Sequence, residues 1–193
     1  MRLRSLVVAV IVAVAAAWGL TAAVDAQTRG RAARGGAAAG AADRQVHGNL
    51  AEVMRGILFP QSNVVFTVQS VDPASIKPAD DPSTAADPLL STYGGWQAVA
   101  NSGIALAESA NLLTIPGRVC SNGRPAPIQN ADWIKFVAGL REAGMFTYKV
   151  GMAKNRDGIL DASDKVSTAC SNCHEVYREK TPEQGGLKAR CTK

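Results

Sequence analysis

The sequence predicts an all-α fold, an antiparallel up-down-up-down four-helix bundle. Four segments carry apolar residues at spacings of three and four, which is the period of a helix that buries one face. Proline and glycine concentrate between these segments. The alternation expected of a strand is limited to the short stretch 64–68. Short and moderate connections between amphipathic helices favour neighbours that run in opposite directions.

Length and composition narrow the class of protein. The chain has 193 residues, enough for one domain with a sizeable core. With 47% hydrophobic and 19% charged residues it is neither a disordered polyelectrolyte nor a polytopic membrane protein. The net charge of +5 is scattered along the chain and aromatic residues make up only 5%, so we expect no nucleic-acid partner.

The first 26 residues have the pattern of a secretory signal. Arg2 and Arg4 precede the apolar run 6–20, and small Val24 and Ala26 occupy the −3 and −1 positions of a cleavage site. The run is shorter than the roughly 20 residues of a spanning helix, so we expect no stable membrane span after cleavage, although an uncleaved anchor stays open. The signal places the mature chain in a bacterial periplasm. Residues 27–43, mostly Arg, Gly and Ala, form a flexible leader, and residues 44–193 form the domain.

The first helix is predicted over residues 43–59, with Pro60 as its stop signal. A long proline-rich connection follows over residues 60–91, in which residues 64–68 form an extended piece packed against the domain. The second helix spans about residues 92–115 and ends at Pro116 and Gly117.

Asn130 is the predicted N-cap of the third helix. Its apolar stripe includes glycines, which indicates that another element approaches closely; the stripe comprises Trp133, Phe136, Val137, Leu140, Gly144, Tyr148 and Gly151. Asp161 or Ser163 caps the fourth helix, which reaches about residue 180 before Pro182.

The fourth helix contains Cys170-Ser171-Asn172-Cys173-His174, the C-x-x-C-H attachment sequence of haem c. Cysteines three residues apart lie on one helical face, where each can form a thioether with a haem vinyl group. The adjoining imidazole then reaches the iron. The motif therefore predicts one covalent haem held by Cys170 and Cys173, with His174 as iron ligand.

A redox-active cysteine pair and a zinc site are two alternative uses of this motif. A redox-active C-x-x-C of the thioredoxin type lies at the start of a helix in a strand-rich protein, unlike this one. A zinc site needs a fourth ligand, for which Cys120, Cys191 or His47 would have to serve, and no second ligand pair exists. Haem attachment is the favoured interpretation.

No methionine follows His174, so a sixth iron ligand must come from earlier in the chain. The candidates are Met54, Met145, Met152 and His47.

The motif continues through Tyr177 and Arg178 as C-x-x-C-H-x-x-Y-R, and on the fourth helix of a bundle this resembles the cytochrome c prime (class II cytochrome c) family. The resemblance implies a haem inside the bundle, with His174 as proximal ligand and with Tyr177 and Arg178 beside the cofactor. It also implies a distal residue from the first helix and, in many members, a homodimer through the first two helices.

On the first helix, Met54 followed by Arg55 matches the place where methionine-ligated members carry the sixth ligand. Leu50 departs from the basic residue that the family often has four positions earlier. Because Leu50 and Met54 are i and i+4 neighbours, either residue can stand over the iron, and an apolar residue there leaves the iron five-coordinate.

The two remaining cysteines, Cys120 and Cys191, follow helices that point the same way in the predicted bundle. In an oxidising compartment we expect them to form a disulfide. Two free or intermolecular thiols are the alternative.

The predicted function is single-electron transfer between redox partner proteins, without catalysis. The alternative is a five-coordinate cytochrome that binds a small gas, nitric oxide or carbon monoxide, against apolar residues such as Leu50. A peroxidase or reductase activity would need a distal acid or base, and His47 is the only candidate.

Overall fold

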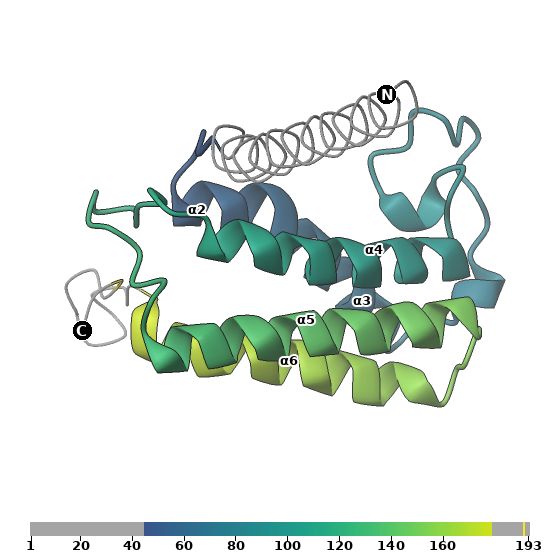
Figure 1. The fold of residues 1–193 in the computed structure, drawn as a ribbon. Coiled ribbons are helices and arrows are strands. Elements are labelled where there is room, and N and C mark those ends of the chain that lie inside the picture. The colour runs from purple at the N-terminus through teal and green to yellow at the C-terminus, as the bar shows by residue number, and fades with distance from the viewer. Residues whose placement is uncertain (1–44, 179–190, 192–193) are drawn as a thin grey trace, which may run out of the picture. The chain divides into compact units, whose positions relative to one another are not determined.

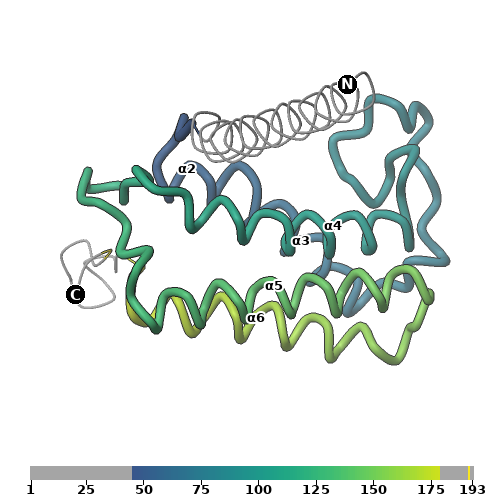
Figure 2. The backbone as a smooth tube through the Cα atoms, in the orientation of Figure 1, coloured from purple at the N-terminus to yellow at the C-terminus, as the bar shows by residue number. Residues whose placement is uncertain are grey.

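A computed structural model of the chain describes residues 45–178 and residue 191, which, apart from Gln45, belong to the compact unit Val46–Lys193. The predicted signal (1–26) and leader (27–43) lie outside the described residues. Within the described ranges the protein is helical without a β-strand, and four helical segments pack against one another (Figures 1 and 2), so the all-α prediction is confirmed. No helix among the described residues is long and apolar enough to cross a bilayer.

The first helical segment starts later and ends later than predicted. It comprises α2 (Leu50–Val53), the π-helical turn η1 (Met54–Leu58) and α3 (Phe59–Thr67). Its start is fixed by a capping box, in which the Asn49 side chain accepts from the Glu52 amide and the Glu52 carboxylate accepts from the Asn49 amide. The predicted start at residue 43 was wrong, since residues 45–49 are not helical.

Pro60 does not end this segment, contrary to the prediction. It lies at the beginning of α3, directly after the π-helical turn, in which the Phe59 amide donates to the Met54 carbonyl five residues earlier. In a regular α-helix a proline lacks one hydrogen bond and its ring collides with the carbonyl four residues before it. The wider π turn avoids this collision, and the helix continues.

The extended piece predicted for residues 64–68 was also wrong. Val64 and Val65 lie in α3 and Val68 is its C-cap, and all three are buried. Burial of this apolar face outweighs the strand preference of β-branched residues. The true connection therefore begins after α3, and it contains two short 3₁₀ turns, η2 (Pro73–Ser75) and η3 (Pro88–Leu90), each capped by the preceding aspartate.

The other helices agree better with the prediction. The second is α4 (Trp96–Ser109) with the 3₁₀ turn η4 (Ala110–Thr114). The third, α5 (Ala131–Met152), begins directly after Asn130, although the Asn130 side chain does not cap it. The fourth, α6 (Gly158–Tyr177), begins before both predicted caps, and Ser163 is buried inside it.

The backbones of α4 and α5 approach closely at the glycines of the predicted stripe. A Cβ atom built on Gly103 would lie 2.3 Å from the Tyr148 nitrogen, and one on Gly151 would lie 2.5 Å from the Ala100 nitrogen. Residues early in α4 meet residues late in α5, and residues later in α4 meet earlier ones in α5, so the two helices are antiparallel. The prediction of a close approach is confirmed.

Buried or bridging arginines join chain segments at the two ends of the helices. The guanidinium of buried Arg118, after η4, donates to the carbonyl of Gly48 before α2 and to that of Leu112. At the opposite end Arg156, between α5 and α6, donates to the carbonyls of Val68 and Gln69. Four backbone carbonyls thus accept hydrogen bonds that connect α4 to α2 and the α5–α6 turn to α3.

The structure contains the predicted disulfide between Cys120 and Cys191, whose Cα atoms lie 5.8 Å apart. Both cysteines are buried. The bond fixes Cys191 to the segment between η4 and α5.

Gly144→Ala should lower the free energy of unfolding by about 1–3 kcal/mol, because its Cβ would lie 2.6 Å from the Ala107 nitrogen on α4. Gly139→Ala is the matched control on α5, since nothing lies within 4 Å of its Cβ. It should raise stability by about 0.5–1 kcal/mol through the better helix propensity of alanine. Urea titration measures both, and equal effects of the two changes would contradict the close packing.

Replacing both Cys120 and Cys191 by serine should lower the free energy of unfolding by about 4 kcal/mol, because the bond closes a loop with a sequence separation of 71. Chemical denaturation under non-reducing conditions measures the change. An unaltered midpoint would mean that the bond does not form.

Candidate functional site

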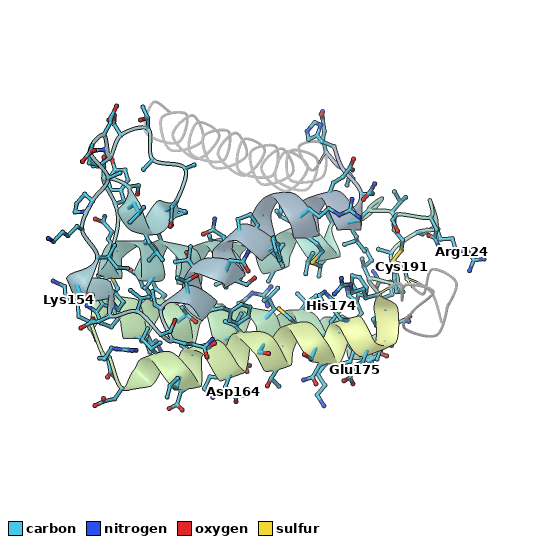
Figure 3. All side chains as sticks on the ribbon, turned by 180° about the vertical axis from the view of Figure 1, so that it is seen from behind. Arg124, Lys154, Asp164, His174, Glu175 and Cys191 are labelled. Atoms are coloured by element: carbon cyan, nitrogen blue, oxygen red, sulfur yellow. A yellow bond between two sulfur atoms is a disulfide. The ribbon has the colours of Figure 1, made fainter. Side chains whose placement is uncertain are left out.

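The C-x-x-C-H motif lies near the C-terminal end of α6, with its two cysteines and its histidine on one face. Cys170, Cys173 and His174 are half-buried, whereas Ser171 and Asn172 between them are exposed. In Figure 3, His174 lies on the side of α6 that faces the first helical segment, and Asp164 and Glu175 lie on the other side. The helix therefore presents the two thiols and the imidazole together.

The side chains on the core-facing side of α6 become more exposed at this motif. Ile159, Ala162 and Val166 in the first half of the helix are completely inaccessible. Farther along, Cys170 and Cys173 pack against the edge of the same core but remain partly exposed. The first half of α6 thus anchors the helix, and the second half places the thiols and the imidazole at the margin of the core.

The four cysteines separate into two kinds. Cys120 and Cys191 are bonded to each other, while Cys170 and Cys173 are free thiols. Burial raises the pKa of Cys170, and burial with the nearby Cys170 and Asp132 raises the pKa of Cys173 to about 11. A redox-active pair of the thioredoxin type needs the opposite shift, so these thiols do not fit that chemistry.

The His174 imidazole has no hydrogen-bond partner among the described residues. Burial, and then the positive charge of Arg178, lowers its pKa, which favours the neutral ring. A neutral imidazole with a free nitrogen is the form that binds a metal.

Tyr177, predicted to lie beside a cofactor, contacts α5. Its ring lies edge-on to Trp133, with centroids 5.0 Å apart, and also to Phe136. Its hydroxyl donates to Asp132 Oδ1 at 2.6 Å and accepts from Asn130 Nδ2 at 3.3 Å. Buried Tyr177 therefore joins the end of α6 to the start of α5, while Arg178, just after α6, is exposed.

The candidate distal residues occupy different environments. Met54 is half-buried at the first position of the π turn, and Leu50 is buried one turn earlier. His47 was predicted on the first helix, but it precedes the helix and is exposed. Met145 is half-buried on α5, and Met152 at the end of α5 is 62% exposed.

Asp132 was not predicted as a site residue; it accepts a hydrogen bond from Tyr177, and its charge contributes to the raised pKa of Cys173. The only sequence signal for Asp132 was an acidic residue in the first turn of a helix, which is a common helix-stabilising feature. A cleft of about 470 Å³ also lies between α5 and α6 beside the motif; its lining comprises Lys135, Phe136, Ala138, Gly139, Glu142, Ala169 and Asn172.

Within residues 45–178 and 191 no three His, Cys, Asp or Glu side chains gather as a metal site would require. The arrangement of Cys170, Cys173 and His174 can instead provide two covalent attachment points and one axial ligand. Comparison of the chain with family models, with curated proteins and with solved structures found no match.

In the folded, haem-free chain, iodoacetamide should modify Cys173 far more slowly than in the denatured chain. Raising the pKa from 9.0 to about 11 lowers the thiolate fraction at pH 8 roughly a hundredfold, and only the thiolate reacts. Mass spectrometry of timed samples measures the two rates. Modification in the folded chain at the denatured rate would contradict the burial of this thiol.

Proposed function

We propose that this chain is a periplasmic c-type cytochrome of a bacterium, which carries one covalent haem and transfers single electrons between redox partner proteins. The observation that carries the proposal is the donor set on α6. Two free thiols one turn apart and an imidazole without a hydrogen-bond partner among residues 45–178 and 191 share one half-buried face, while the other two cysteines are joined to each other. This set fits the two thioethers and one axial bond that haem c requires.

An antiparallel up-down-up-down four-helix bundle with the haem inside is part of the proposal. The glycine contacts between α4 and α5 and the Tyr177–Asp132 hydrogen bond between α6 and α5 support opposite directions for these neighbours. The haem would lie against the half-buried face of α6, on the side toward the first helical segment. Membership of the cytochrome c prime group rests on the motif and its Tyr-Arg extension.

When bound, haem supplies an iron centre that exchanges one electron at a time. Cys170 and Cys173 would fix the group to α6, and His174 would bind the iron from the next position along the helix. The partial burial of these three side chains limits access of water, which favours electron transfer over ligand chemistry. Met54, half-buried on the first helical segment, would provide a thioether as the sixth ligand.

Electron transfer is favoured over peroxidase or reductase chemistry by the position of His47. This residue was the only candidate for a distal acid or base, and it is exposed and precedes the first helix. Export is part of the proposal because the Cys120–Cys191 bond is of a kind that persists in oxidising compartments.

The mature chain, produced with covalent haem maturation, should keep its haem through acid–acetone extraction. The pyridine haemochrome spectrum should show two saturated vinyl groups, because both thiols form thioethers. Replacing both Cys170 and Cys173 by alanine should release the haem, whereas replacing both Cys120 and Cys191 by serine should retain it. Complete extraction of colour from the unaltered chain would overturn the proposal.

Met54→Leu tests the sixth ligand, with Met145→Leu on α5 as the matched control. The unaltered chain and M145L should be low-spin and resist carbon monoxide, whereas M54L should become high-spin and bind carbon monoxide rapidly. The visible spectrum with and without the gas measures this difference. If the unaltered chain already binds the gas rapidly, the five-coordinate gas-binding function replaces electron transfer.

A further inference from the structure

The last turn of α6 is held by a polar contact that the attachment chemistry does not require. Tyr177 lies one turn beyond His174, and its hydroxyl donates to Asp132 at 2.6 Å while its ring packs on Trp133. The Arg178 amide donates to the His174 carbonyl, so the backbone of the proposed iron ligand belongs to this same turn. A displacement of Tyr177 would therefore also move His174.

Asp132 brings negative charge to the motif from another helix. It lies in the first turn of α5 and is half-buried, and its Oδ1 lies 2.6 Å from the hydroxyl of Tyr177, one turn beyond His174. A carboxylate held against the last turn of α6 also acts on a haem attached to the adjoining turn, since the interaction falls off only with distance and local dielectric. The exposed Arg178, whose amide donates to the His174 carbonyl, provides an opposing positive charge close to that residue.

We infer that Asp132 and Tyr177 together set the reduction potential of the haem and hold its histidine ligand in place. This inference rests on the proposed function. Asp132 would act through its hydrogen bond with Tyr177 and through its charge, so it is a positioning and electrostatic residue. Its carboxylate stabilises ferric iron, which carries one more positive charge than ferrous iron, and thereby lowers the potential.

The Tyr177 hydroxyl moderates this effect. By donating a hydrogen bond it places a partial positive charge against the Asp132 carboxylate and reduces the field that reaches the haem. Removing the carboxylate charge and removing the hydroxyl should therefore shift the potential in opposite directions. A purely structural role of the pair would give shifts in the same direction.

The test measures the midpoint potential of the holoprotein by spectroelectrochemistry. Asp132→Asn should shift the equilibrium toward ferrous haem by about two- to tenfold, because it removes the charge and keeps an acceptor for the tyrosine. Tyr177→Phe should shift it toward ferric haem while keeping the ring contacts. Asp164→Asn is the matched control, since it removes the same charge from the exposed side of α6 (Figure 3) and should change the equilibrium less.

Hydrogen exchange of the haem-free chain gives an independent readout of the positioning role. The amides of the last turn of α6 should exchange faster in Y177F than in the unaltered chain or in D164N. Potentials of D132N and D164N that shift equally, or shifts of D132N and Y177F in the same direction, would overturn the inference while the cytochrome function stands. A chain that retains no covalent haem would overturn both.

Discussion

The close contact between the backbones of α4 and α5 is the constraint on which the rest of the molecule depends. At Gly103, Gly144 and Gly151 no side chain separates the two helices, and a methyl group at any of these positions would overlap backbone atoms of the partner helix. This contact fixes the direction and register of α5. Since α6 packs on α5, and Tyr177 binds the first turn of α5, the register of α5 also decides where the motif lies.

Local sequence patterns were sufficient to predict a helix where the capping residue, the apolar stripe and the absence of proline all indicate the same boundaries. The third helix follows an asparagine, carries a continuous apolar stripe and contains no proline, and its observed start is the predicted one. The C-x-x-C-H motif was equally recognisable, because it consists of residues close together in sequence. The placement of Cys170, Cys173 and His174 on one face follows directly from helical spacing.

The first helical segment shows where local rules fail. Pro60 alone predicts the end of a helix, yet here a π turn accommodates it. Burial of Val64, Val65 and Val68 stabilises the continued helix, and this burial depends on contacts with residues distant in sequence. The extra residue of the π turn also shifts the buried positions, so that Val53 and then Leu58 face the core while Ile57 is 36% exposed. No periodicity count on a regular helix foresees that shift.

The contacts of Tyr177 could not be predicted from the sequence for a different reason. Its partners Asn130 and Asp132 lie 47 and 45 residues away, and each has an ordinary local explanation at the start of a helix. The resemblance to a family predicts Tyr177 beside a cofactor, and the structure shows in addition that its hydroxyl and ring contact α5. Only the packing of α5 against α6 shows that these residues act as one group.

The division of the cysteines has a consequence for biogenesis. Four thiols have three possible full pairings, and each of them oxidises Cys170 and Cys173, so the proposed haem attachment requires a chain in which only Cys120 and Cys191 are bonded. Thiol oxidation proceeds through the thiolate, which burial disfavours at Cys170 and Cys173. A chain that folds before it is oxidised thus protects Cys170 and Cys173 from forming the wrong disulfides, and slow folding would yield a wrongly bonded product that could not take up the proposed haem.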